Sequence, residues 1–237
     1  MINYNTQEIQ QLSKNKFDKL VIGIPYNHLN LSNMKNKTDM KIGVNITRNV
    51  DQVIVNISGK PFATPNDIGY IQNLDTFSED LTNFTGIEFD TDYLLNEAPV
   101  FENHVTIDID RPDPCGDLSL IREILKNRTD KWDIYRYGNL KYLDGLAVVP
   151  KTKEKVRLII YCKGVELRNS KNKEFRKIFS GEYLERTRNM LRFEYQIRDF
   201  KHTREAYGLG KSEVPTIAAL FCSQRNVVAD IFDRLID

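Results

Sequence analysis

The stretch RLIIYCKGVELRN, from Arg157 to Asn169, opens with apolar and β-branched residues and then becomes polar. Successive side chains of a β-strand point to opposite faces of the sheet. One face of this stretch then carries Arg157, Ile159, Tyr161 and Lys163, and the other carries Leu158, Ile160 and Cys162. The stretch therefore predicts a strand with one apolar face that helices can cover and a second face of ionisable groups.

Two other stretches alternate in the same way. HVTIDID (His104–Asp110) and LRFEYQIR (Leu191–Arg198) each have one apolar face. The opposite faces carry His104, Thr106, Asp108 and Asp110 in the first stretch, and Arg192, Glu194, Gln196 and Arg198 in the second. Strands outnumber helices in the chain and tend to follow one another as hairpins, so we expect an α+β fold with a mainly antiparallel sheet.

The rest of the chain predicts further strands and helices. We expect a strand over Phe17–Tyr26, a hairpin of KIGVNITR and QVIVNIS, and a hairpin in GLAVVPKTKEKVRLIIYCK with its turn at Lys151–Lys155. Helices are expected near Ile68, over Phe77–Phe84, after Asp117 as N-cap, over the basic stretch Lys173–Asn189, in TREAYGL and from about Thr216. The 237 residues predict one domain, with a separate N-terminal lobe over residues 1–100 as the alternative.

Composition and cysteine usage narrow the class of protein. Hydrophobic residues make up 41% of the chain and charged residues 28%, as in globular proteins. No apolar run reaches the length of a membrane span, and the start, MINYNTQEIQQL, lacks the pattern of a signal peptide. The three cysteines, Cys115, Cys162 and Cys222, are far apart, which disfavours a disulfide framework or a cysteine zinc site and leads us to expect the cytoplasm.

The net charge of +1 conceals two regions of opposite sign. Residues 51–150 hold 8 basic and 18 acidic side chains, and residues 151–200 hold 14 basic and 7 acidic ones. Such segregation suits a polyanion partner together with a cation site. A solvated, salt-bridged surface produces the same pattern, so charge alone leaves both interpretations open.

The acids on the polar faces indicate a metal site. Asp is depleted in strands, yet Asp108 and Asp110 lie two residues apart on one face, where they repel unless a cation or a basic group lies between them. Glu194 adds a third carboxylate if its strand is a neighbour, and His104 offers a nitrogen ligand. Oxygen ligands of this kind suit Mg²⁺ or Mn²⁺. The alternative is a half-exposed antiparallel sheet, which alternates without any function.

A divalent cation beside a basic segment suits phosphate-ester chemistry, and Tyr161 is the candidate nucleophile. A phenol with a pKa near 10 is ionised in about one part in a thousand at neutral pH, a deficit of roughly 4 kcal/mol. Lys163, two residues further on, can favour the phenolate and neutralise phosphate charge. The alternative is a structural strand tyrosine.

Together these blocks resemble the gene II/X-type rolling-circle replication initiators of filamentous phages and related plasmids. RLIIYCKGVELRN is similar to the family's Y-x-K-x-x-E block, LRFEYQIR to its R-F-E block, and HVTIDID to its acidic strand. FDKLVIGIPY resembles the opening strand and GKPFATPNDIGYIQNL a loop before the acidic strand, so the resemblance runs from about residue 17 to 225. It implies a palm-like antiparallel sheet with helices packed on one face, as in HUH endonucleases.

The resemblance also implies roles for individual residues. Tyr161 is the implied nicking nucleophile, with Lys163 and Glu166 as its neighbours, and Glu194 is the acid of the second block. Either Asp108 or Asp110 can match the acid of the family's acidic strand, and the two alternatives stay open.

The implied activity is site-specific nicking and rejoining of single-stranded DNA at a replication origin, through a 5′-phosphotyrosyl intermediate and with Mg²⁺ or Mn²⁺. The implied partners are single-stranded or supercoiled origin DNA and a host helicase and polymerase, in the bacterial cytoplasm and without a membrane. We expect the basic segment to bind phosphates through Arg157, Lys171, Lys173, Arg176, Lys177, Arg186, Arg188 and Arg192.

Two other functions fit the same residues. A non-catalytic DNA-binding replication or regulatory protein needs the basic segment but not Tyr161. A metal-dependent nuclease that uses water needs the acids, with Tyr161 as a structural residue. A second tyrosine, Tyr183 or Tyr195, is a further candidate for the chemistry.

Overall fold

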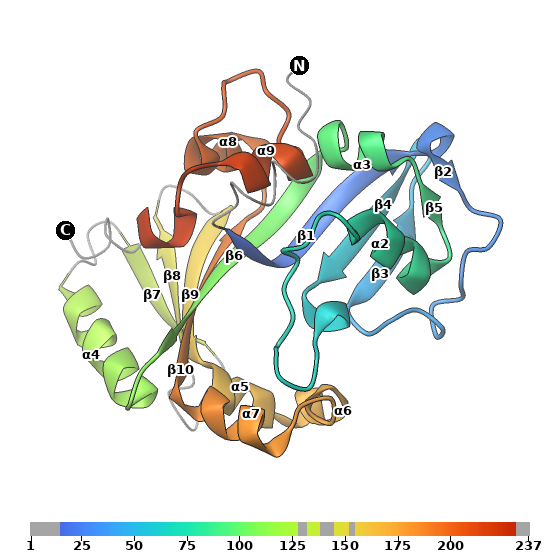
Figure 1. The fold of residues 1–237 in the computed structure, drawn as a ribbon. Helices are drawn as coiled ribbons and strands as arrows, with labels where there is room; N and C mark the ends of the chain where they lie inside the picture. The colour runs from blue at the N-terminus through green and yellow to red at the C-terminus, as the bar shows by residue number, and fades with distance from the viewer. Residues whose placement is uncertain (1–14, 128–131, 138–144, 152–154, 231–237) are drawn as a thin grey trace. The chain divides into compact units, whose positions relative to one another are not determined.

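The computed structural model describes residues 15–127, 132–137, 145–151 and 155–230 (Figure 1). The chain divides into two compact units. Unit 1 consists of Met1–Phe62, Gly69–His104 and Arg198–Asn226, and unit 2 consists of Ala63–Ile68, Val105–Ile197 and Val227–Asp237. Unit 1 thus joins most of the N-terminal 100 residues to a segment that lies near the other end of the sequence.

The described residues of unit 1 combine strands with four helices. Its strands are β1 (Lys16–Pro25), β2 (Leu29–Asn30), β3 (Val44–Arg48), β4 (Gln52–Ser58), β5 (Glu88–Phe89) and the first residues of β6 (Val100–Asp110). Its helices are α2 (Phe77–Thr85), α3 (Thr91–Asn96), α8 (Phe200–Tyr207) and α9 (Ile217–Cys222), with 3₁₀ turns η1 (Tyr26–His28) and η2 (Lys60–Phe62).

Within its described residues, unit 2 contains the rest of β6 and four further strands. The strands are β7 (Trp132–Tyr137), β8 (Gly145–Pro150), β9 (Val156–Cys162) and β10 (Met190–Ile197). Among the helices are α4 (Pro114–Lys126), α5 (Lys163–Arg168), α6 (Lys173–Arg176) and α7 (Gly181–Arg186), with 3₁₀ turns η3 (Ser170–Asn172) and η4 (Thr187–Asn189). Residues 227–230 are also helical.

The predicted α+β class is confirmed. The strand order is β3-β4-β1-β6 in unit 1 and β6-β10-β9-β8-β7 in unit 2, so eight of the described strands belong to the larger sheet. The pairs β1–β4 and β3–β4 in unit 1, and β7–β8, β8–β9 and β9–β10 in unit 2, are all antiparallel. Both predicted hairpins are present, and the tip of the second, residues 152–154, lies outside the described residues.

The core of unit 1 follows from the alternation of β1 and β4. Leu20 and Ile22 of β1 and Val55 and Ile57 of β4 are fully buried. Leu20 pairs with Ile57, and Ile22 with Val55, so apolar side chains face one another across the two strands. This explains why two short sequence stretches with period-two alternation form the centre of this unit.

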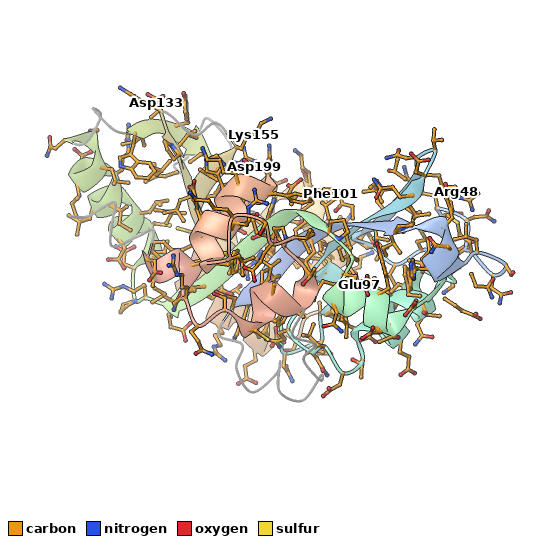
Figure 2. All side chains as sticks on the ribbon, turned by 90° about the horizontal axis from the view of Figure 1, so that it is seen from above. Arg48, Glu97, Phe101, Asp133, Lys155 and Asp199 are labelled. Atoms are coloured by element: carbon orange, nitrogen blue, oxygen red, sulfur yellow. The ribbon has the colours of Figure 1, made fainter. Side chains whose placement is uncertain are left out.

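Helix α8 is fastened to β6 by an aromatic stack and a buried polar network. Phe101, labelled in Figure 2, stacks on Phe200 with ring centroids 5.5 Å apart. The Asn103 amide donates to the Thr203 hydroxyl (3.1 Å) and accepts from the Tyr207 hydroxyl (2.9 Å). Because buried polar groups need partners, these bonds fix the part of β6 that carries His104.

Helix α4 begins earlier than predicted. Asp113, not Asp117, is the N-cap, and its side chain accepts a hydrogen bond from the Gly116 N–H. Pro114 follows at the first helical position, where a missing N–H costs nothing. Asp117 instead forms an ion pair with Arg111.

Two other predictions of local structure need correction, and some elements were not predicted. The helix expected near Ile68 is absent from the described residues, because Thr64 and Asp67 bridge across a tight turn and Ile71 bridges to Phe17. The basic stretch is two short helices, since Ser180 adopts an extended conformation and caps α7. Helix α3 and strand β7 were not predicted at all.

None of the helices in the described part of the chain is both long and apolar enough to cross a membrane.

Candidate active site

Tyr161 lies near the end of β9 on the polar face of the unit 2 sheet. It pairs in register with Arg192 of β10, and Ile159 pairs with Glu194. Directly paired residues in an antiparallel sheet point to the same face. The Tyr161 hydroxyl accordingly donates a hydrogen bond to Glu194 Oε2 at 3.2 Å, and both side chains are only 5% exposed. The polar sides predicted for the two strands thus lie on one face of the sheet.

Glu194 receives a second hydrogen bond from its own strand. The Gln196 amide donates to Glu194 Oε1 at 2.6 Å, and the Arg157 guanidinium donates to the Gln196 carbonyl oxygen. Donors therefore reach both oxygens of the Glu194 carboxylate. This network fixes the carboxylate in the orientation that meets the Tyr161 hydroxyl.

The sequence pattern predicted that the strand continues to Lys163, but it does not. Strand β9 ends at Cys162, and Lys163 is the first residue of α5. Its ammonium nitrogen nevertheless lies 5.5 Å from the centre of the Tyr161 ring and 2.9 Å from Glu166 Oε2. A buried positive charge is thus held beside the phenol by a helix rather than by strand alternation.

Glu166 holds Lys163 in place from one turn further along α5. The Asn172 amide donates to Glu166 Oε1 at 2.6 Å, on the other side of the carboxylate. Burial raises the pKa of Glu166, but the charge and hydrogen bond of Lys163 and the hydrogen bond of Asn172 outweigh it, and the pKa lies below its ordinary value. Glu166 is therefore ionised at neutral pH and forms an ion pair with Lys163.

Asp108 and Arg192 form a bidentate ion pair. Arg192 Nε lies 2.6 Å from Asp108 Oδ1 and its Nη2 lies 2.7 Å from Oδ2. Arg192 is fully buried, so its side chain contacts Asp108 rather than solvent. Asp110 also lies near an arginine, with its Oδ2 3.4 Å from Arg186 Nη2. The repulsion expected between the two aspartates of β6 is therefore reduced, because each has an arginine partner.

His104 and Asp18 lie together in unit 1. A ring nitrogen of His104 and a carboxylate oxygen of Asp18 lie within 4.8 Å of each other. His104 Nε2 forms a hydrogen bond with Glu102 Oε1 at 2.7 Å, the kind of carboxylate contact that orients histidine ligands in metal sites. This pair of donors fits a divalent cation.

Glu102 is the most strongly perturbed acid in this neighbourhood. The hydrogen bond with His104 lowers its pKa most, burial raises it, and Lys19 at 3.0 Å lowers it further, to about 2. The carboxylate therefore stays ionised and holds His104 in a fixed orientation. The sequence analysis did not identify Asp18 or Glu102 as site residues. Asp18 lies in a strand that the sequence predicted, and Glu102 lies in β6.

The other two candidate tyrosines differ from Tyr161. The Tyr183 hydroxyl accepts a hydrogen bond from the backbone N–H of Ile68 at 3.0 Å. Burial and the nearby Asp67 carboxylate raise the pKa of Tyr183, which disfavours its phenolate. Tyr195 pairs with Leu158 and so points to the opposite, apolar face of β9 and β10.

Basic side chains predicted to bind DNA gather on η3, α6, α7 and η4. Lys171, Lys173, Lys177, Arg186 and Arg188 are exposed, and Arg176 is half-buried. Lys177 pairs with Glu174, and Arg188 with Glu185, whereas Lys171, Lys173 and Arg176 make no ion pair among the described residues. Arg157 is half-buried on β9 and is bound to Gln196.

Unit 1 also has an open cavity of about 620 Å³. It is lined by residues of α3, α9 and the segment before α9, among them Glu97, labelled in Figure 2, and Glu213, Thr216 and Cys222. None of the residues predicted for function lines it.

Comparison with known proteins does not identify a family. Neither the protein-family models nor the curated proteins contain a match to this chain.

Proposed function

We propose that this protein is a metal-dependent DNA nickase and ligase of the rolling-circle initiator type, with an HUH-like palm and Tyr161 as its nucleophile. The observation that carries the proposal is the hydrogen bond from the Tyr161 hydroxyl to Glu194, with the Lys163 ammonium 5.5 Å from the same ring. A phenol is a poor nucleophile at neutral pH and needs a group that takes its proton and a charge that favours its anion. Both are present within unit 2.

In the proposed reaction the phenol oxygen of Tyr161 attacks a backbone phosphorus atom, and its proton passes to the Glu194 carboxylate. The bond between phosphorus and the 3′-oxygen breaks, and that oxygen leaves as a 3′-hydroxyl after it gains a proton. The DNA 5′-phosphate remains on Tyr161 as a phosphotyrosyl ester. Reversal by a 3′-hydroxyl rejoins the strand, and no ATP is needed because one phosphate ester replaces another.

Mg²⁺ or Mn²⁺ would supply charge neutralisation and orientation of the phosphoryl oxygen. Asp18 and His104 are the donors of unit 1 that would hold it, with Glu102 orienting the imidazole. Glu194, Asp108 and Asp110 stay predicted ligands on sequence grounds. Asp108 would first have to leave Arg192, which already contacts both of its oxygens.

The test is a covalent-adduct assay with the full chain. Labelled single-stranded origin DNA and Mn²⁺ are incubated with the protein and resolved on a denaturing gel, and the adduct peptide is mapped by mass spectrometry. Tyr161→Phe removes only the hydroxyl and should abolish both nicking and the adduct. Tyr195→Phe, on the opposite face of the same sheet, is the matched control and should retain both.

The outcomes distinguish the three functions. An adduct on another tyrosine, or an adduct that survives in Tyr161→Phe, contradicts the proposal. Cleavage without an adduct indicates a nuclease that uses water. Binding without cleavage indicates a non-catalytic DNA-binding protein.

A further inference from the structure

Two cysteine thiols meet where helix α4 begins and strand β9 ends. The Sγ atoms of Cys115 and Cys162 lie 3.2 Å apart, and both residues belong to unit 2. Cys115 is in the first turn of α4, and Cys162 is the last residue of β9. The two positions are 47 residues apart, so the fold rather than local sequence brings the thiols together.

Both thiols are held by the packing of a helix on a sheet. Cys162 alternates with Leu158 and Ile160, which are buried on the face that α4 covers. The start of α4 is fixed by its Asp113 cap, and the helix is anchored further along by Leu118 and Leu125, which are buried. The contact between the sulfur atoms is therefore a built feature of unit 2.

We propose that Cys115 and Cys162 are a redox-active pair that closes reversibly to a disulfide. A disulfide needs sulfur atoms about 2.05 Å apart, so the two atoms must approach by about 1.1 Å. Rotation of the Cys115 side chain moves its sulfur over such a distance without a shift of the helix backbone. The proposal concerns the thiols alone and does not rest on the nicking activity.

The exposure of the two residues gives each a role. Cys115 is exposed and Cys162 is buried, so a small oxidant reaches Cys115 first. With a low-molecular-weight disulfide as oxidant, the Cys115 thiolate attacks one sulfur, expels one thiol and forms a mixed disulfide. The Cys162 thiolate then attacks the Cys115 sulfur and expels the second thiol. Two protein thiols are oxidised and one small disulfide is reduced to two thiols, so the electrons balance.

The third cysteine provides a control. Cys222 belongs to α9 of unit 1, and Cys115 and Cys162 are the two thiols in contact within unit 2.

A pair of thiols that only shares a hydrogen bond in a packed interior would stay reduced in the presence of a small disulfide. A redox-active pair would close.

The experiment incubates the full chain with oxidised glutathione or with dithiothreitol, denatures it, alkylates free thiols and measures the intact mass. The reduced chain should carry three alkyl groups, one for each cysteine, and the oxidised chain should carry one. Peptide mapping without reduction should find Cys115 linked to Cys162, and dithiothreitol should reverse the link. Cys222→Ser should still form it, and Cys115→Ser, at an exposed position, should lose it.

Three results would overturn the proposal. They are three alkyl groups after oxidation, a stable glutathione adduct on Cys115 without the internal link, or a link that joins different chains.

Discussion

At the scale of single residues, the candidate site depends on how one phenol is surrounded. Tyr161 donates to Glu194, which also accepts from Gln196, so the carboxylate is oriented before any substrate arrives. Lys163 places a positive charge near the ring. Ionising a phenol at neutral pH costs roughly 4 kcal/mol. Glu194 can accept the proton, and the positive charge of Lys163 stabilises the phenolate, so the two residues act together to lower this cost.

Glu194→Gln tests the carboxylate as proton acceptor. The amide oxygen can still accept from Tyr161 but cannot take its proton, so nicking should fall about 10²- to 10⁴-fold in single-turnover assays. Titration of Mn²⁺ into the same variant separates the two roles considered for Glu194. If the Mn²⁺ affinity is unchanged, Glu194 acts as a proton acceptor alone. If the affinity falls, Glu194 is a metal ligand. Full nicking activity in Glu194→Gln would contradict both roles.

At the scale of elements, strand alternation predicted faces but not partners. It put Tyr161 on the polar side of one strand and Arg192 and Glu194 on the polar side of another, and the register of β9 and β10 brings these sides to one face. It could not predict that Asp108 would be held by Arg192, because that depends on which strands are neighbours. It also ran one residue too far, since Lys163 begins α5, where a helix brings its charge back towards the tyrosine.

The turn of α5 that carries Lys163 and Glu166 should make stability depend on pH. The pKa of Glu166 is lowered in the folded state, so its contribution is fully present above the ordinary value near 4.5 and is lost as pH falls through the lowered value. Glu166→Gln leaves the buried Lys163 ammonium without its ion pair and should cost about 2 kcal/mol near neutral pH, since Glu166 is partly exposed.

Urea unfolding measures this difference between Glu166→Gln and the unmutated protein near neutral pH and near pH 3. The gap should narrow at the lower pH, because protonation of Glu166 below its ordinary pKa removes the ion pair. Glu182→Gln is the control, because Glu182 is exposed on α7 and forms no ion pair within the described residues. A gap that is the same at both pH values would show that the ion pair does not contribute.

The surface of η3 and α6 should contribute to DNA binding through charge alone. Reversing Lys171, Lys173 and Arg176 to Glu removes three phosphate contacts and should reduce the log–log salt slope for single-stranded DNA by about two units. Reversal of Lys37, Lys41 and Lys211, which are exposed in unit 1, makes the same change of charge elsewhere and is the control. Equal slopes for the two triple variants would mean that the α6 surface is an ordinary solvated one.

At the scale of the whole molecule, the sequence predicted the α+β class and most strands, but not that a segment near the end of the chain belongs to the same compact unit as residues of its first half. Arg198–Asn226 joins residues from the first half of the chain, and no local pattern signals a contact over such a separation. The bonds that make the join, such as Asn103 with Thr203 and Tyr207, come from single polar residues. The contact between Cys115 and Cys162 is of the same kind, since sequence spacing indicated only that the cysteines were far apart.

The proposed disulfide should stabilise unit 2 selectively. A link that closes a loop of 47 residues lowers the entropy of the unfolded chain and stabilises by up to about 4 kcal/mol, less any strain. The single tryptophan, Trp132, lies in β7 of unit 2, so its fluorescence in urea reports on this unit. Oxidation should raise the urea midpoint of this signal in the unmutated protein and in Cys222→Ser, but not in Cys115→Ser. If the link forms and the midpoint does not rise, strain in the folded state offsets the entropy gained, and the sulfur atoms are not placed for closure without distortion.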